Sequence, residues 1–167
     1  MLEPTRNKLK FAHFQFLRKA LHSEAAAQSD GLRVLDVGCG PGNLPDFAGP
    51  IEGSHWYGLD LWEHQLRQAH EKRTYECLFQ VNLVDGLPFG NERFNVVVCN
   101  EVLMYLPNAH DMLAEFHRVL APEGKLFVYN PISSFPNFVG KLKRWARFIH
   151  QENRTVVLDR QRDWKRA

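Results

Sequence analysis

Three alternating glycines are the first residues in this chain whose type and spacing could do chemistry. Gly38, Gly40 and Gly42 follow directly on the apolar run VLDV at residues 34–37. Glycines in such a turn reach backbone angles that are closed to other residues, let a ligand approach the main chain, and precede the N–H groups of a following helix. The alternative is a strand-to-helix turn whose glycines are only structural. The loop therefore predicts a small-molecule site if other residues support it.

Two aspartates accompany the glycines. Asp60 ends a second apolar run about twenty residues beyond the loop, where a carboxylate can accept hydrogen bonds from both ribose hydroxyls of a nucleotide. Asp36 lies at the end of the first apolar run, where burial is costly unless donors or a cation are near. For Asp60 the alternative is a turn residue at a strand end. The pair favours a nucleoside ligand that is uncharged or cationic near the loop.

Two nucleotide fingerprints do not fit this loop. The dinucleotide pattern G-x-G-x-x-G would need a glycine where Asn43 stands, which disfavours hydride transfer with a nicotinamide cofactor. The triphosphate loop G-x-x-x-x-G-K-[ST] does not match either, since no lysine follows the glycines.

Helices and strands are expected to alternate along the chain, because helical spacings of apolar residues alternate with short apolar runs. Asn108 is expected to cap one helix, whose apolar stripe contains Met112, Leu113, Phe116 and Leu120. The predicted helices are 14–21, from the glycines to 48, 62–73, 108–120 and 138–149, and the predicted strands are 33–37, 55–61, 76–81, 93–99 and 125–130, with one further short strand at 155–158. This alternation predicts an α/β fold with a parallel sheet wrapped by helices, whose ligands lie at the carboxyl ends of the strands.

Length and composition favour one soluble domain. The chain has 167 residues, 44% of them hydrophobic, and lacks the run of roughly 18 apolar residues that a membrane span needs. We expect a cytoplasmic protein without a membrane partner. Cys39, Cys77 and Cys99 have no spacing typical of a disulfide framework or a zinc site, and the histidines form no ligand pattern, so no metal is assigned. Basic residues outnumber acidic ones near the end, and we expect a domain at 1–150 and a basic tail at 151–167.

Four stretches in this order resemble class I S-adenosylmethionine-dependent methyltransferases of the small type 11 kind. VLDVGCGPG is similar to their first motif, YGLDL to their acid-ended second strand, DGLPF…RFNVVVCNEVLMYLPN to their third-strand loop and fourth strand, and EFHRVLAPEGKLFVYNP to their following helix, turn and fifth strand. The resemblance covers about residues 30 to 131. It implies a Rossmann-like, doubly wound, mostly parallel sheet of order 3-2-1-4-5 with helices on both faces. The implied methyl donor is S-adenosylmethionine, and S-adenosylhomocysteine is the implied product.

The resemblance also implies roles for individual residues. Asp36 and the main chain at Gly38 would meet the amino and carboxylate end of the methionine, and Asp60 the ribose. The complete set of cofactor-binding residues implied in this way is Asp36, Gly38, Cys39, Gly40, Gly42, Asp60, Leu61, Asn82, Leu83 and Asn100. Leu61 would pack on the adenine. Asn82 stands where relatives have an aspartate that accepts from the adenine amino group, with Asp85 as the alternative, and Asn100 would help through its main-chain carbonyl.

Methyl transfer mainly requires that the acceptor approach an electrophilic methyl group in line. The methyltransferases of this family therefore do not have to share one catalytic residue. Where many relatives have a histidine after the fourth strand, this chain has Tyr105. A phenol is a weak base at neutral pH, so Tyr105 is the candidate catalytic residue in a positioning role, with structural packing as the alternative.

The end of the chain departs from the family. Members usually add two strands after the fifth, one of them antiparallel, whereas here only TVVL at 155–158 is expected to form a strand, so part of the usual C-terminal strands is predicted to be missing. A bare fifth strand would invite a homodimer or another partner to cover the sheet edge. Three hypotheses remain: an edge-covering partner, a non-catalytic S-adenosylmethionine-binding regulatory or scaffold subunit, and a self-sufficient methyltransferase. The acceptor is expected to be a small molecule, because no nucleic-acid methylation motif such as N/D-P-P-Y/F occurs.

Overall fold

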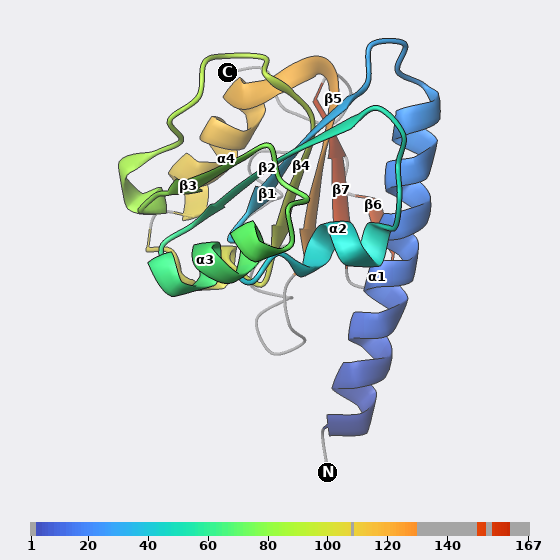
Figure 1. The fold of residues 1–167 in the computed structure, drawn as a ribbon, viewed down its shortest axis with the longest axis horizontal. Helices are drawn as coiled ribbons and strands as arrows, with labels where there is room; N and C mark the ends of the chain where they lie inside the picture. Colours follow the sequence, from blue (N-terminus) through green and yellow to red (C-terminus); the bar gives the residue numbers. More distant parts are fainter. Residues whose placement is uncertain (1–2, 108, 130–149, 153–154, 161–167) are drawn as a thin grey trace.

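A computed structural model gives the fold and describes residues 3–107, 109–129, 150–152 and 155–160 (Figure 1). Its centre is a seven-stranded sheet of order β3-β2-β1-β4-β5-β7-β6. The strands are β1 (Leu32–Val37), β2 (Ser54–Asp60), β3 (Cys77–Gln80), β4 (Phe94–Asn100), β5 (Leu120–Tyr129), β6 (His150–Glu152) and β7 (Thr155–Asp159), and the helices are α1 (Glu3–Ala26), α2 (Asn43–Ala48), α3 (Glu63–Glu71) and α4 (Ala109–Val119). Short 3-10 helices, η1 (Leu83–Asp85) and η2 (Leu103–Tyr105), follow β3 and β4. The predicted order 3-2-1-4-5 is confirmed.

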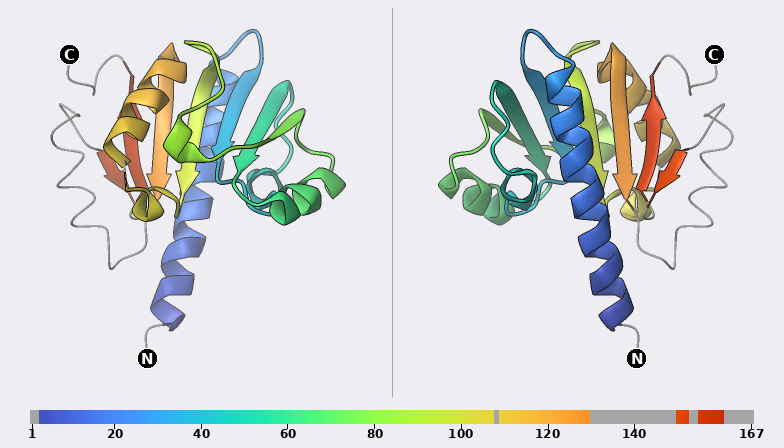
Figure 2. Two further views of the ribbon diagram at one scale, coloured as in Figure 1. Left: turned by 90° about the vertical axis from the view of Figure 1, so that its left-hand side faces the viewer. Right: turned by 90° about the vertical axis from the view of Figure 1, so that its right-hand side faces the viewer.

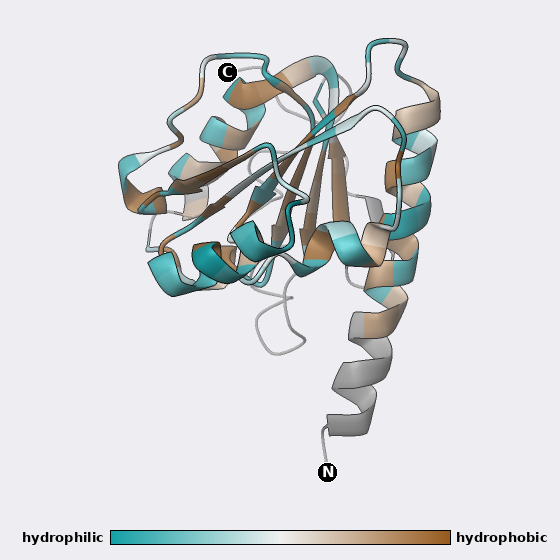
Figure 3. Cartoon of the chain, viewed as in Figure 1, coloured by the Kyte–Doolittle hydropathy of each residue, from teal (hydrophilic) through white to brown (hydrophobic). Residues whose placement is uncertain are grey.

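The middle of β4 is an unbroken apolar run, as expected for a strand that is covered on both faces of the sheet. Val96, Val97 and Val98 of β4 are all fully buried and point alternately to the two faces. On one face α1 and α2 pack through Leu17, Leu21 and other residues, and on the other face α4 packs through Phe116 and its neighbours (Figure 2). Figure 3 shows the strands mainly in brown and the outer surface of α3 in teal. The predicted helices on both faces are confirmed.

The C-terminal strands correct one prediction. β7 pairs antiparallel with β5, from Lys125 opposite Asp159 to Tyr129 opposite Thr155, so the expected strand TVVL is present. A second strand was not expected, and this was wrong, since β6 pairs with β7. The reason is that His-Gln-Glu has no apolar or β-branched run to mark a strand. Because β7 pairs with β5, the edge of β5 is covered. The bare fifth strand that was expected to invite a partner is therefore not found. The predicted tail after residue 150 contains β7.

Two predicted features lie outside the described residues, namely the cap at Asn108 and the helix over 138–149.

The strand β5 begins at Leu120, earlier than predicted, and its register against β4 shifts between Phe94 and Val96. Within the described ranges, no helix is both long and apolar enough to cross a membrane.

Candidate functional site

A cavity opens at the carboxyl ends of β1 and β4, where the chain order of the sheet reverses. Its volume is about 460 Å³, which suits a small-molecule ligand. The residues that line it are Gly38, Asp60, Leu61, Trp62, Val81, Asn82, Leu83, Glu101, Val102, Tyr105 and Leu106. Ligands of open α/β sheets bind at this position, because the loops after neighbouring strands separate there.

Six of the predicted site residues line this cavity and five do not. Gly38, Asp60, Leu61, Asn82, Leu83 and Tyr105 line it. Asp36, Cys39, Gly40, Gly42 and Asn100 lie outside its lining, although the first four belong to the strand end and loop around Gly38.

The glycine loop is tied to the end of β2. The N–H groups of Gly38 and Cys39 both donate to the carbonyl of Leu59, at 2.8 and 2.9 Å. Gly38 has φ +70°, and a Cβ atom there would lie 2.2 Å from Val102 Cγ2. The packing of Val102 against the loop therefore requires a glycine at position 38.

Gly42 and Gly40 differ in what surrounds them. A Cβ atom on Gly42 would lie 3.0 Å from the side chains of Ala69 and Tyr75, so this position must be small for packing within the protein. At Gly40, with φ +53°, the nearest neighbour of a Cβ atom would be Gln65 Oε1 at 3.8 Å, an ordinary van der Waals distance, so a Cβ would meet no clash there. Gln65 Oε1 is itself buried without a hydrogen-bond partner among the described residues.

Asp60 bridges the end of β2 and the glycine loop. Its Oδ2 accepts from the N–H of Gly40 and its Oδ1 from the N–H of Trp62, both at 2.9 Å. A carboxylate has about four lone-pair sites. Asp60 can thus accept two further hydrogen bonds from a ligand while these main-chain contacts persist.

Asp36 is almost fully buried, with 3% of its surface exposed. Its Oδ2 accepts from the Tyr75 hydroxyl at 2.7 Å. Burial raises the pKa of Asp36 to about 7, with a smaller contribution from the negative charge of Asp60, while the hydrogen bond from Tyr75 lowers it. Burial thus moves the titration of this carboxyl group from the usual acidic range toward neutral pH. Sequence reasoning missed Tyr75, because nothing in the sequence links it to Asp36.

The loop after β3 supplies an apolar wall. Leu83 is buried beside the cavity, whereas Leu61 and Trp62 from the end of β2 are 47% and 60% exposed at its mouth. Asn82 Oδ1 accepts from the N–H of Val84 at 3.2 Å and caps the 3-10 helix η1. Asp85, the alternative to Asn82, does not line the cavity.

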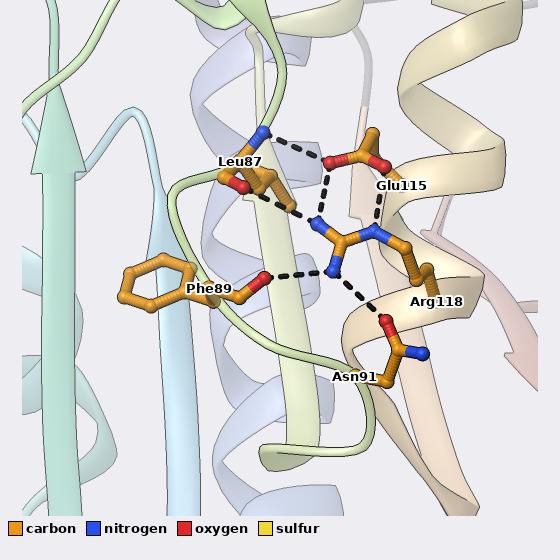
Figure 4. A network of polar contacts seen from close by, with 5 residues as sticks. All are labelled: Leu87, Phe89, Asn91, Glu115 and Arg118. Atoms are coloured by element: carbon orange, nitrogen blue, oxygen red, sulfur yellow. Dashed lines mark hydrogen bonds and ion pairs between the residues drawn. The ribbon is translucent and has the colours of Figure 1, made fainter.

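A charged network fixes the continuation of this loop. Arg118 of α4 donates to the carbonyls of Leu87 and Phe89 and to Asn91 Oδ1, at 3.2, 2.7 and 3.1 Å. Glu115 pairs with Arg118 at 2.7 Å and accepts from the N–H of Leu87 at 3.0 Å (Figure 4). The network ties the segment between β3 and β4 to the helix on the same face.

Two residues at or against the end of β4 were not selected by sequence reasoning. Glu101 lines the cavity with φ +58°, an uncommon angle for a residue with a side chain, and its N–H donates to the carbonyl of Tyr129 at 2.8 Å. His13, from α1, is fully buried and hydrogen-bonds Asn100 Oδ1 at 3.0 Å. The signal for Glu101 was its place directly after Asn100.

Tyr105 in η2 is 76% exposed, so it does not pack into the core.

Cys39 has the surroundings of an unreactive thiol. Burial and the charges of Asp36 and Asp60 raise its pKa above the ordinary value, the opposite of what a nucleophilic cysteine needs.

Comparison with known proteins identifies a family for residues 35–128, which match a family model described as "Methyltransferase domain". The chain is 30% identical over 164 residues to "Sterol methyltransferase-like 1" of Botryococcus braunii, covering 94% of this chain and 41% of that protein. It is 36% identical over 135 residues to "Demethylmenaquinone methyltransferase" of Listeria monocytogenes, covering 76% and 54%. The chain thus spans about half the length of these curated relatives.

Solved structures agree in fold. The crystal structure of an S-adenosylmethionine dependent methyltransferase from Mesorhizobium loti aligns with a TM-score of 0.60 and 25% identity, over 73% of this chain and 55% of that one. A protein of Methanococcus maripaludis aligns over 98% of this chain and 92% of its own, with a TM-score of 0.72 and 12% identity, which is a likeness of fold alone.

Proposed function

The chain belongs to the methyltransferase-domain family, and on that premise we propose that it transfers a methyl group from S-adenosylmethionine to a small-molecule acceptor. The methyl donor follows from the family and the fold, and S-adenosylhomocysteine is its product. The observation that carries the proposal is the cavity at the strand-order reversal, with Asp60 held at its wall by the glycine loop.

The residues around this cavity fit an adenosyl ligand. Asp60 keeps acceptor capacity for two ribose hydroxyls, and Leu61 and Leu83 offer apolar surfaces for a flat base. The N–H of Gly40 donates to Asp60, and a Cβ atom at position 40 would lie 3.8 Å from Gln65 Oε1, a buried acceptor without a hydrogen-bond partner in the described part of the chain. A buried acceptor without a partner is costly unless a ligand supplies a donor.

Each part of the ligand has candidate partners in this chain. We assign the ribose to Asp60, the adenine to Leu61, Leu83 and Asn82, and the amino-acid end to Asp36, the main chain of the loop from Gly38 to Gly42, and Asn100. The bound donor supplies an electrophilic methyl group on a sulfonium. The protein's contribution is to hold the acceptor in line with that methyl group and to exclude water.

The cavity mouth favours an acceptor with an apolar body. Trp62 and Tyr105 expose apolar surface around it. The names of the relatives refer to sterols, squalene and demethylmenaquinone, which are apolar or have apolar parts. We assign Tyr105 a positioning role at the acceptor, because its ring is exposed at the cavity edge. A cytoplasmic location is part of the same proposal and agrees with the free thiols of Cys39, Cys77 and Cys99.

Calorimetric titration with S-adenosylmethionine, S-adenosylhomocysteine and NAD tests the ligand. We expect the first two to bind and NAD not to bind, and a protein that takes up neither adenosyl compound would overturn the proposal. Transfer is tested with a radiolabelled methyl donor over a panel of sterol, quinone and polar acceptors. Binding without transfer to any acceptor would favour the non-catalytic subunit instead.

A further inference from the structure

We propose that Tyr75 is a positioning residue for the methyl donor, whose hydroxyl holds and orients the Asp36 carboxylate for the ammonium group of the ligand's amino-acid end. This inference rests on the proposed function. It adds a residue outside the glycine loop and outside the cavity lining, from the connection between α3 and β3.

The position of the Tyr75 ring is set by two glycines. A Cβ atom on Gly42 would lie 3.0 Å from Tyr75 Cε2, and one on Gly58 would lie 3.0 Å from Tyr75 Cδ1. One of these glycines belongs to the loop and the other to β2. The absence of both side chains makes room for the ring, and its hydroxyl then reaches Asp36 Oδ2 at 2.7 Å.

Lys72 ties the same connection to the loop at a second point. Its ammonium group donates to the carbonyl of Gly42 at 3.2 Å, to Asn43 Oδ1 at 2.6 Å and to Asp46 Oδ2 at 2.7 Å. The main chain that carries Tyr75 is therefore held against the loop independently of the tyrosine hydroxyl. Removal of that hydroxyl should leave the ring and the loop in place.

The hydroxyl matters because of the charges around Asp36. The titratable groups near this carboxyl are Asp60 from β2, Cys39 from the loop, Cys99 from β4 and Tyr75. Burial raises the pKa of Tyr75 well above its ordinary value, as it does for both cysteines, so Tyr75 stays a hydrogen-bond donor. Tyr75 is the donor to Asp36 among the described residues. The hydrogen bond from Tyr75 stabilises the ionised form of Asp36, whereas burial destabilises that form.

Asp36 also has capacity left for a ligand. Its Oδ2 atom accepts the hydrogen bond from the Tyr75 hydroxyl, and Oδ1 has no donor among the described residues. An ammonium group that reached Oδ1 would meet a carboxylate already oriented by Tyr75. A neutral Asp36 would offer no charge to that ammonium, so donor affinity should follow the ionisation of Asp36.

The test compares two product-like ligands that differ only at the amino-acid end. S-adenosylhomocysteine carries the ammonium and carboxylate, whereas 5′-methylthioadenosine has a methyl group in their place. Both are titrated into the wild-type protein, Tyr75→Phe and Tyr57→Phe, from about pH 6 to about pH 8. Tyr57→Phe is the matched control, because Tyr57 also donates to a carboxylate, Glu76 Oε2 at 2.8 Å, at an exposed site.

We expect Tyr75→Phe to lose about fivefold in affinity for S-adenosylhomocysteine near pH 7 and only about twofold near pH 8, as an Asp36 pKa raised by about one unit would produce. The ratio of variant to wild-type affinity cancels the titration of the ligand's own ammonium group. Affinity for 5′-methylthioadenosine should not change, and Tyr57→Phe should match the wild type with both ligands.

Two results would overturn the inference while leaving the proposed function intact. One is an unchanged affinity of Tyr75→Phe for S-adenosylhomocysteine at every pH. The other is an equal loss for both ligands, which would assign Tyr75 to loop packing alone. A wild-type protein that binds neither ligand would overturn the proposed function itself, together with this inference.

Discussion

The Asp60 carboxylate accepts a hydrogen bond from the main-chain N–H of Gly40, with Oδ2 2.9 Å from the nitrogen. This bond joins the end of β2 to the glycine loop at the wall of the cavity. Because the N–H of Trp62 donates to the other oxygen, the orientation of Asp60 is set without a ligand. A site that is already ordered loses less conformational entropy when it binds.

Replacement of Asp60 should weaken every ligand that carries a ribose. Hydrogen bonds to a charged group are worth about 1.5–3 kcal/mol each, so Asp60→Ala should lose at least about tenfold in affinity for both S-adenosylhomocysteine and 5′-methylthioadenosine by calorimetry. Asp60→Asn keeps one acceptor oxygen and should lose less. Asp30→Asn, at an exposed acid that accepts from Ser29, is the control. Unchanged affinity of Asp60→Ala would contradict the assigned ribose site.

Asp36→Asn should stabilise the free protein and weaken the binding of S-adenosylhomocysteine. Burial holds the pKa of Asp36 at about 7 in the folded state, against about 4 in an unfolded chain. Between these values the folded state binds more protons, so the contribution of Asp36 to stability is fully present below about pH 4 and is lost as the pH rises to about 7. At about pH 8 the variant should be more stable by on the order of 1–3 kcal/mol.

Urea unfolding at several pH values measures this effect. The readout is the difference in unfolding free energy between Asp36→Asn and the wild type, because other groups such as Glu115, whose pKa Arg118 lowers, titrate equally in both. The difference should grow from about pH 4 to about pH 7 and then level off. A difference that does not vary with pH would show that Asp36 ionises as it does in water.

Local patterns in the sequence marked individual strands and the glycine loop, whereas the strand order and most of the cavity-wall residues were implied by the resemblance to the methyltransferase family. The valines at 96–98 predicted a buried strand, and the spacing from Gly38 to Asp60 predicted two neighbouring strand ends. The bond between Tyr75 and Asp36 could not be predicted, since it joins residues 39 apart in sequence and depends on the space left by Gly58. The strand β6 was missed because its pairing with β7, and not an apolar pattern of its own, makes it a strand.

Tyr105 offers a test of the positioning role. Its side chain is 76% exposed at the cavity edge, so Tyr105→Phe and Tyr105→Ala should both fold with thermal stability close to that of the wild type. If the ring positions an apolar acceptor, the Phe variant should keep its activity within about threefold, and the Ala variant should raise the acceptor KM with little change in affinity for S-adenosylhomocysteine. A Phe variant with a much lower kcat would instead assign proton transfer to the hydroxyl.

The network around Arg118 should matter for stability. Arg118→Ala removes the donors to the carbonyls of Leu87 and Phe89 and leaves the Glu115 carboxylate without its cation (Figure 4). We expect a loss of about 2–3 kcal/mol in unfolding free energy, measured by urea denaturation. Arg67→Ala is the control, since Arg67 pairs with Glu63 one turn away on an exposed helix surface, where such pairs contribute about 0.3–0.5 kcal/mol. Equal effects of the two variants would mean that the loop is not held by Arg118.

Alanine at positions 40, 42 and 53 separates glycines that the backbone requires from a glycine that a ligand requires. Gly53 and Gly40 have similar positive φ angles, +68° and +53°, and a Cβ atom at either position would have its nearest neighbour at an ordinary van der Waals distance, 3.7 or 3.8 Å. Gly40→Ala and Gly53→Ala should therefore lose similar amounts of stability, about 1–2 kcal/mol for a left-handed residue with a side chain. Gly42→Ala should lose more, because its Cβ would also press on Ala69 and Tyr75.

Binding then distinguishes the two similar variants. A Cβ atom at position 40 would enter the space beside Asp60 and Gln65, where we place the ligand, whereas one at position 53 lies in the turn before β2, away from the cavity. Gly40→Ala should therefore weaken S-adenosylhomocysteine by at least about tenfold while Gly53→Ala binds it as the wild type does. If both variants bind equally well, the glycine at position 40 serves only the backbone, and the ligand does not approach the loop there.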